Sequence, residues 1–459
     1  MTVRPYIFAV IALLATTQAT NAHVSERGLV LLLPTDIYIF FGVLAVLLTV
    51  FLTVLVPADL FWAVFQKSHA QALRPVIRGR NSVSLLSLAG FAVLIALGYF
   101  GPHDPLTNLL PLTLFTLWWI CFPFLQALFG DIWAWVNPWS GAVSLVFGNR
   151  IRLHLPPYLG QWPAVVTYIL AGVYTLTDIA PDDPSRLAVI AGIYWLTTFL
   201  LCGLFGPTWL QRGEGFTVFF TLIAKLSPFG LRPFRWVFPG QAILDTGIVG
   251  VSCTVFCVTI LALGSFDGLN ETFWWMARIG INPLEFPGRS AVVWPNRLGM
   301  LIAVVALNMI FAGVVWLGLV LIRQTAEFPR LFARLGLCLL PIALGYHAAH
   351  FLTSAMVSLQ YIPQALNDPL HNGVRLLGLP DYYVTTSFFN QHRTVQQIWL
   401  TQAAAIVLAH MLAVILSHVI ALQEFASHRR AVISQLPVSA FMVAYTFFGL
   451  WLLSSPVAL

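Results

Sequence analysis

Four histidines lie within two long apolar stretches in the last quarter of the chain, and they are the residues best placed for chemistry. His347 and His350 belong to one stretch, and His410 and His418 belong to the next. Ionisable side chains are costly inside a bilayer, and they usually face the interior of a helix bundle or a pathway through it. The four imidazoles are therefore the first candidates for a functional site.

Helical spacing predicts that three of these imidazoles lie at a similar depth. His347 and His350 are three residues apart, so they project from one helix face. At a rise of about 1.5 Å per residue, His347 lies about 18 Å and His410 about 15 Å from the inner ends of two antiparallel helices. His418 lies two turns deeper, about 80° around the helix from His410, where it fits a supporting or gating role.

Three neutral imidazoles at one depth favour a transition-metal site, with copper or zinc as the most suitable ion. His347, His350 and His410 are the expected ligands, and His23 and His418 are further candidates. No Asp or Glu stands beside the histidines in the sequence. A metal-bound hydroxide is therefore the expected catalytic group at this centre.

Other roles for these histidines stay open. Histidines also form hydrogen bonds between transmembrane helices, which is a purely structural use. A haem is a further alternative; His347 and His350 share a face and cannot both be axial ligands, so His410 would be the opposite one. Met356 and Met411 flank the histidines, and thioethers favour copper(I), although methionine in a helix more often only packs.

The composition is that of an integral membrane protein. Of 459 residues, 59% are hydrophobic and only 9% are charged, whereas soluble domains carry about 25% charged residues. The net charge of +6 is explained by basic residues in cytoplasmic loops, and it does not indicate nucleic-acid binding. All five cysteines lie in apolar segments, so no disulfide framework is expected.

The expected fold is all-α, a polytopic transmembrane helical bundle of about ten spanning helices in a single domain, residues 23–459. A span needs about 20 apolar residues. The segments that meet this length are 37–56, 82–99, 109–129, 162–180, 187–207, 247–264, 298–322, 335–359, 396–420 and 437–454.

The N-terminus is typical of a secretory signal peptide over residues 1–22. Arg4 supplies the charge, Ile7 to Leu14 form a short apolar core, and small residues end at Ala22. An uncleaved first helix is the alternative. Cleavage after Ala22 would leave His23 with a free amine beside its imidazole, which together chelate copper. Basic residues are more frequent in the loops expected inside, which places both mature termini in the periplasm and the bundle in the bacterial inner membrane.

The loops add three expectations. Residues 215–226 are expected to form an amphipathic helix in the membrane interface. The outer loops 265–297 and 360–395 carry acidic residues that would cover an outward-facing cavity: Asp267, Glu271, Glu285, Asp368 and Asp381. No phosphate-binding loop or serine-nucleophile motif occurs, which argues against nucleotide-driven transport and serine hydrolysis.

Short motifs along the mature chain resemble a bacterial membrane family whose members commonly carry the name fenitrothion hydrolase. They are His23 to Arg27, Trp135-x-Asn137-Pro138-Trp139, Glu214-Gly215-Phe216 leading to Ala224–Pro228, Ser265 to Leu269, Gly345-Tyr346-His347-x-x-His350, and His410 with His418. The resemblance implies cleavage of an aryl phosphorothioate triester to a nitrophenol and a dialkyl thiophosphate. A metal at His347, His350 and His410 would polarise the phosphoryl group and supply hydroxide.

Two rivals to this hydrolase remain. One is a protein for copper or other transition-metal transport or metal loading, with His410 and His418 forming a row that leads inward. The other is a membrane subunit whose histidines only stabilise helix packing. The expected partners are membrane lipid, a small lipophilic substrate and a second membrane subunit or another copy of the chain. No nucleic acid is expected.

Overall fold

The computed structural model describes residues 29–65, 79–148, 152–231, 234–247, 249–285, 288–380 and 382–457. Within these ranges, nine helices are long and apolar enough to cross a membrane. The expectation of an all-α polytopic helical bundle is therefore confirmed. The signal peptide predicted for residues 1–22 and the candidate ligand His23 lie outside the described residues, as does Asp381.

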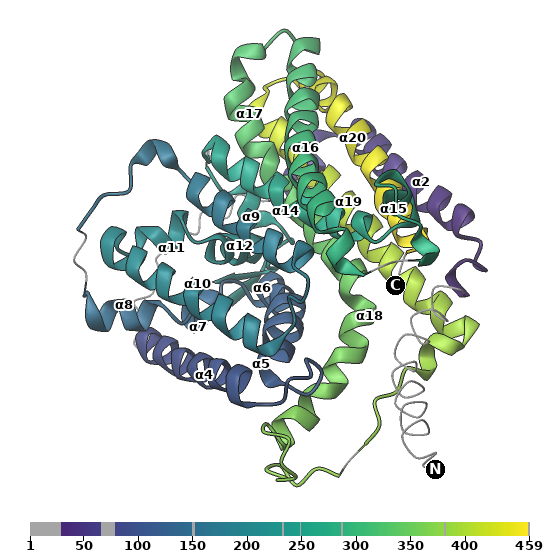
Figure 1. Cartoon of the computed structure of the whole chain (residues 1–459). Helices are drawn as coiled ribbons and strands as arrows, with labels where there is room; N and C mark the ends of the chain where they lie inside the picture. The colour runs from purple at the N-terminus through teal and green to yellow at the C-terminus, as the bar shows by residue number, and fades with distance from the viewer. Residues whose placement is uncertain are drawn as a thin grey trace.

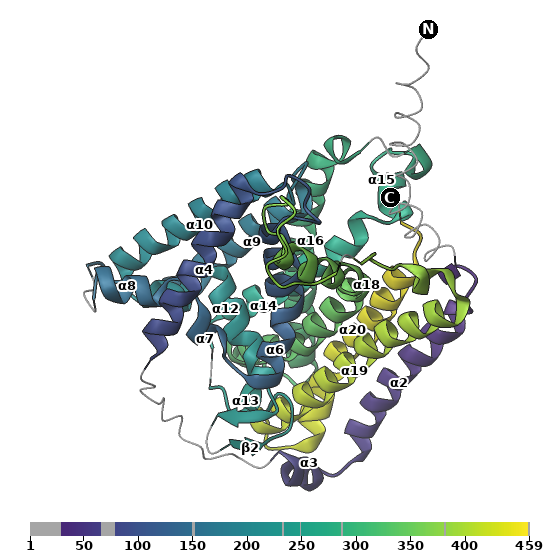
Figure 2. The ribbon, with the colours of Figure 1, turned by 90° about the horizontal axis from the view of Figure 1, so that it is seen from below.

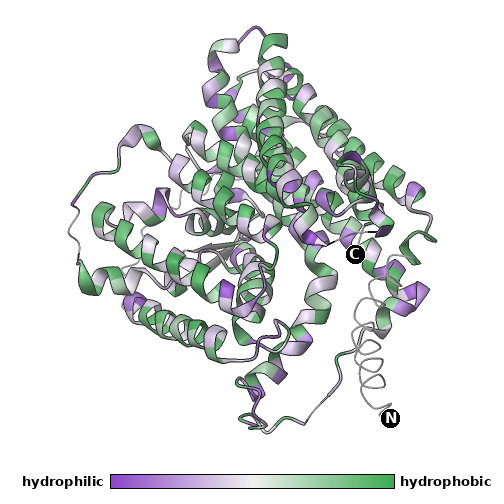
Figure 3. Cartoon of the chain, viewed as in Figure 1, coloured by the Kyte–Doolittle hydropathy of each residue, from purple (hydrophilic) through white to green (hydrophobic). Residues whose placement is uncertain are grey.

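The membrane-length helices are, in chain order, α2 (Thr35–Leu55), α4 (Arg80–Phe100), a run of α5 (Leu109–Pro111), η1 (Leu112–Cys121) and α6 (Phe122–Phe129), then α10 (Pro184–Phe205), α14 (Val251–Asn270), α16 (Val293–Leu321), α18 (Leu340–Asn367), α19 (His392–Glu424) and α20 (His428–Ser454). The span that contains α18 begins at Thr325 and includes the short helix α17 (Phe328–Leu335). Many large apolar side chains of these helices are exposed. Figure 3 shows that hydrophobic residues dominate the long helices.

Shorter elements connect these helices: α3 (Ala58–Val64), α7 (Trp133–Val136), α8 (Ser140–Val146), α9 (Trp162–Thr177), α11 (Thr208–Arg212), α12 (Gly215–Ile223), α13 (Gln241–Leu244), α15 (Phe273–Arg278) and α17 (Phe328–Leu335). In the described part of the chain, the strands are β1 (Phe229–Leu231) and β2 (Phe234–Trp236), which pair antiparallel as a small hairpin.

One expected span differs in length. The segment predicted at 162–180 is α9, which has 16 residues and ends at Thr177. Asp178 has an extended backbone conformation and begins a tight turn that leads to α10. Sixteen residues are fewer than the about 20 needed to cross a hydrocarbon core.

The helices form two groups on either side of α14 and α18 (Figures 1 and 2). One group contains α4 to α12. The other contains α16, α19 and α20, with α2 packed against α19 and α20 at its edge. α18 packs against η1 of the first group and against α19 of the second. The first group and the two central helices surround the candidate site.

The expectation of an interfacial helix at 215–226 is wrong in its location. The helical segment itself is present as α12 and a 3-10 turn, η3 (Ala224–Leu226). Val218, Phe219 and Phe220 are buried, and the Phe220 ring contacts Trp118 and Trp133. The segment is nearly all apolar, so burial in the protein core stabilises it more than half-immersion in headgroups would.

Candidate functional site

A large apolar cavity lies among the first group of helices and the two central ones. Its volume is about 1280 Å³, which is more than a drug-sized ligand needs. Aromatic and aliphatic side chains of α4, η1, α9, α10 and α12 form most of its wall. α14 and α18 add the polar residues Asp267, Tyr346, His347 and His350. The cavity therefore combines a lipophilic interior with a small group of acid–base side chains.

The central pair in this group is His350 of α18 and Asp267 of α14. His350 Nε2 lies 3.0 Å from Asp267 Oδ2, and the two side chains are 21% and 18% exposed. Asp267 was expected on an outer loop that begins at residue 265. It lies on a helix instead, because α14 continues through Asn270. The pair is an imidazole oriented by a carboxylate, and water has access to it.

Gly268 lets α14 approach α18 at this pair. A Cβ at position 268 would lie 1.9 Å from the Tyr346 hydroxyl oxygen and 3.8 Å from His350 Nδ1. The rings of Tyr346 and His350 are stacked, with centroids 5.8 Å apart and 11° between planes. A side chain at 268 would therefore displace the tyrosine that supports the imidazole.

His347 contacts the irregular helix η1 rather than the pair. Its Nε2 lies 3.0 Å from the carbonyl oxygen of Trp119. η1 is a π-helix, a form that often marks functional sites. The His347 ring also packs edge-on against the Trp119 ring, so both contacts hold α18 against η1.

The expected neighbours α18 and α19 do pack together, but their histidines point apart. The two helices approach closely at Gly345, where a Cβ would lie 2.4 Å from the Cβ of Ala409. His347 is two residues after Gly345, about 200° around the helix, so it faces away from α19. His410 faces the other way, toward Tyr445 on α20, with ring centroids 6.3 Å apart.

His410 and His418 are buried and only partly hydrogen-bonded. His410 Nδ1 lies 2.8 Å from the carbonyl oxygen of Ile406 in its own helix. Among the described residues, Nε2 of His410 and Nε2 of His418 have no hydrogen-bond partner. The His418 ring packs against Phe61 and His428, with centroids 5.0 and 5.8 Å away. These two histidines do not line the large cavity.

The three-imidazole metal centre expected from the sequence does not match this arrangement. His347, His350 and His410 each lie against a different group: a backbone carbonyl of η1, Asp267, and a carbonyl of α19. The described residues contain no group of three or more His, Cys, Asp or Glu side chains placed to hold a metal ion. His410 faces Tyr445, whereas His347 and His350 line the cavity.

A second polar pair, which the sequence analysis does not single out as a site, lies at the cavity wall, where Tyr194 is one of the lining residues. The Tyr194 hydroxyl donates to the Glu214 carboxylate, which also accepts from the backbone N–H groups of Phe216 and Thr217 at the start of α12. Glu214 is fully buried. Glu is not one of the preferred N-cap residues, so the sequence around position 214 gives no N-cap signal for this pair.

The cavity reaches the outer surface of the bundle between α9 and α10. These helices follow each other in the chain but pack on different partners, α9 on α14 and α12, and α10 on α4 and α11. Leu170 of α9 and Ile193 of α10 line the cavity, yet they are 61% and 57% exposed. Because such residues face lipid in a membrane helix, the opening is directed into the bilayer.

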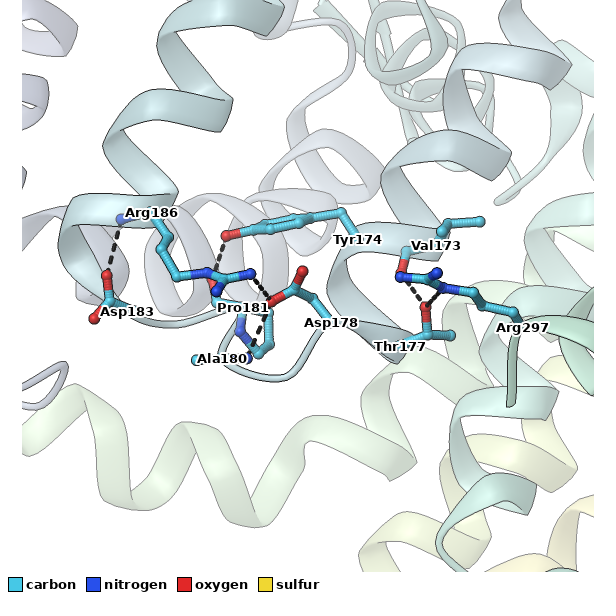
Figure 4. A network of polar contacts seen from close by, with 9 residues as sticks. All are labelled: Val173, Tyr174, Thr177, Asp178, Ala180, Pro181, Asp183, Arg186 and Arg297. Carbon is cyan, nitrogen blue, oxygen red and sulfur yellow. Dashed lines mark hydrogen bonds and ion pairs between the residues drawn. The ribbon is translucent and has the colours of Figure 1, made fainter. Parts of the chain in front are cut away.

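A polar network ties α9 and α10 together at one end of this opening (Figure 4). Arg186 Nη2 lies 2.6 Å from Asp178 Oδ1. The Tyr174 hydroxyl donates to the carbonyl oxygen of Pro181 at 2.8 Å. Arg297 Nε donates to Thr177 Oγ1 at 3.2 Å, which joins α16 to the same turn. The network fixes the turn, while the cavity-lining parts of the two helices stay apart.

The chain matches no protein-family model, and neither a curated protein nor a solved structure matches it significantly.

Proposed function

We propose that this chain is an integral membrane hydrolase that cleaves lipophilic aryl phosphorothioate triesters of the fenitrothion type. One observation carries the proposal: the His350–Asp267 pair lies on the wall of a large apolar cavity. An imidazole held by a carboxylate is the common arrangement for a general base that activates a nucleophile. The motif resemblance supplies the substrate class.

The cavity supports a neutral, aromatic substrate. Trp119, Trp139 and Phe216 are among the rings that line it, and rings of this size pack well against an aryl group. A neutral triester partitions into lipid, so an opening between α9 and α10 would admit it directly from the bilayer. Asp267 and His350 are both partly exposed, which gives water a place beside the bound ester.

The proposed reaction uses these two side chains as a base and its partner. His350 takes a proton from water, and the resulting hydroxide attacks phosphorus. The bond from phosphorus to the aryl oxygen breaks, and the nitrophenolate leaves with the electron pair. Asp267 stabilises the imidazolium until it releases the proton to solvent. The products are the nitrophenolate and a dialkyl thiophosphate, and an easily leaving phenolate needs little acid assistance.

The test is release of nitrophenolate from a chromogenic triester by the full chain in membrane vesicles. Wild-type protein and a His392→Ala control, changed at an exposed histidine at the start of α19, should both turn over the ester. His350→Ala should reduce turnover by about 100-fold or more while the amount of protein in the membrane is unchanged. Equal turnover by His350→Ala and wild type would refute the proposed base.

A second candidate function is transition-metal transport, and a specific observation favours it. The Nε2 atoms of His410 and His418 are buried and unpartnered among the described residues. The two residues lie on one helix about 12 Å apart along its axis, as successive binding positions for a metal ion would. Copper uptake into vesicles that is lost in His410→Ala and His418→Ala, without ester hydrolysis by wild type, would favour this candidate.

A further inference from the structure

A second, smaller pocket lies where four elements meet at one end of the bundle. Its volume is about 260 Å³. It lies between the end of α16, the start of α17, the end of α19 and the start of α20. Its lining residues are Gln324, Glu327, Arg330, Leu331, Glu424, Phe425, Ala426 and Arg430. Three of these elements are membrane-length helices, so their common end lies at the level of lipid headgroups.

Ion pairs fix the side chains on one side of the pocket. Glu424 accepts from Arg330 Nε at 2.7 Å and from Arg334 Nη1 at 2.5 Å. Arg334 also donates to the side chain of Gln423 and to the carbonyl oxygen of Leu244. Glu424 is thus neutralised by two guanidinium groups, and this wall of the pocket carries a net positive charge.

The other half offers two charges of opposite sign that are not used inside the protein. Arg430 and Glu327 line the same pocket. Within the described residues, neither side chain forms an ion pair or a hydrogen bond. A ligand that carries an anionic and a cationic group a few bonds apart would satisfy both.

The start of α20 adds further attraction for an anion. His428, Arg429 and Arg430 occupy its first turn, no acidic residue is present there, and Ser427 makes no capping hydrogen bond through its side chain. The free N–H groups of a helix N-terminus favour an anion. An anion at Arg430 would also relieve the unfavourable position of two cations at this end of the helix.

We propose that this pocket binds the headgroup of phosphatidylethanolamine. The phosphodiester would lie between Arg430 and Arg330, and the ammonium group would donate to Glu327. Leu317 and Leu321, exposed on one face of α16, lead away from the pocket along the membrane and would contact an acyl chain. Basic pockets between transmembrane helices recognise phospholipid headgroups in this way. The inference does not depend on the proposed hydrolase activity.

The test is native mass spectrometry of the full chain, delipidated in detergent and offered equal amounts of phosphatidylethanolamine, phosphatidylcholine and phosphatidylglycerol. Phosphatidylethanolamine adducts should dominate in wild type, because only this lipid has both a phosphate and a donating ammonium group. Arg430→Ala should bind it about tenfold more weakly. Arg429→Ala removes the same charge from the neighbouring residue, which does not line the pocket, and should bind as wild type does.

Further experiments test which protein side chains and which part of the lipid account for the binding. Glu327→Gln should bind phosphatidylethanolamine and phosphatidylcholine equally, since the partner of the ammonium group is lost. Arg430→Gln should repeat the loss seen with Arg430→Ala. Equal binding of all three lipids by wild type, or unchanged binding by both Arg430 variants, would overturn the proposal. Displacement of the lipid by an equal concentration of soluble O-phosphoethanolamine would overturn the assignment to a lipid.

Discussion

His350 Nε2 and Asp267 Oδ2 lie 3.0 Å apart and connect α18 to α14 across the wall of the large cavity. The two residues are 83 positions apart in the chain, and the contact depends on the six helical residues that α14 adds beyond residue 264. No other carboxylate lines this cavity within the described residues. The proposed chemistry therefore depends on the state of this one pair.

Asp267→Asn tests the pair while keeping its shape. We expect kcat for triester hydrolysis to fall by roughly 100-fold or more, with KM little changed, because the amide cannot stabilise the imidazolium. Rates of nitrophenolate release over a range of substrate concentrations give both constants. Asp178→Asn, in the α9–α10 turn, is the matched control and should keep kcat. An Asp267→Asn enzyme with wild-type kcat would contradict the role of the carboxylate.

Gly268→Ala should disturb the site through a steric clash with Tyr346. Its Cβ would lie 1.9 Å from the Tyr346 hydroxyl oxygen, and relieving such an overlap in a packed interior costs about 1–3 kcal/mol. The expected result is a lower thermal unfolding midpoint in detergent and reduced hydrolysis. Gly264→Ala, one turn earlier, is the control, since its Cβ would make an ordinary contact at 3.5 Å with Tyr346.

Removing the obstructing hydroxyl should partly reverse the effect of Gly268→Ala. In the double variant Gly268→Ala/Tyr346→Phe, the overlap with the hydroxyl oxygen is gone and the next nearest atom, Tyr346 Cζ, would lie at 3.2 Å. We expect the unfolding midpoint to recover toward that of Tyr346→Phe alone. A double variant as unstable as Gly268→Ala would show that the strain arises elsewhere.

Ile193→Trp should obstruct the opening between α9 and α10. Ile193 lines the cavity and is 57% exposed, so a larger ring there would narrow the route from the bilayer. We expect KM for a bulky triester to rise several-fold while kcat changes little, since the base is untouched. Leu196→Trp, three residues along α10, exposed and outside the cavity lining, should leave KM unchanged. Identical KM values for the two variants would argue for another route.

His410→Leu separates hydrolysis by the cavity pair from chemistry at a metal centre. His410 faces Tyr445 and not the cavity, and its Nε2 is buried without a partner among the described residues. Leucine at this position removes the buried nitrogen that has no partner, and the Ile406 carbonyl keeps its backbone hydrogen bond within the helix. We expect hydrolysis to be retained and the unfolding midpoint to be equal or higher. Loss of hydrolysis together with loss of bound metal would support the three-imidazole centre instead.

Sequence patterns predicted the membrane frame better than the site. Apolar length identified the spanning helices, and a spacing of three identified His347 and His350 as a pair on one helix. The fall in hydropathy after Gly264 predicts a loop at Asp267, yet the helix continues and Asp267 faces the cavity. Hydropathy cannot separate a helix end from a polar helical turn.

The orientation of the histidines depended on a packing contact that spacing does not contain. The close approach of Gly345 to Ala409 fixes which faces of α18 and α19 meet, and it turns His347 toward η1 and His410 toward α20. Gly345 and Ala409, which stand close to the histidines, are the sequence signal for this contact, because small residues are enriched where membrane helices pack. The sequence does not show that Glu214 is buried and bonded to Tyr194, because the two residues come together only in the folded structure.

The shortness of α9 has a consequence for the lipid around the protein. Its 16 residues extend about 24 Å, whereas a hydrocarbon core is about 30 Å thick. A bilayer meets such a hydrophobic mismatch by thinning locally. The thinning would occur beside α9, at the mouth of the cavity, and would bring interfacial water closer to an ester still dissolved in lipid. A hydrolase for water-insoluble esters needs the dissolved ester and water to meet at one place.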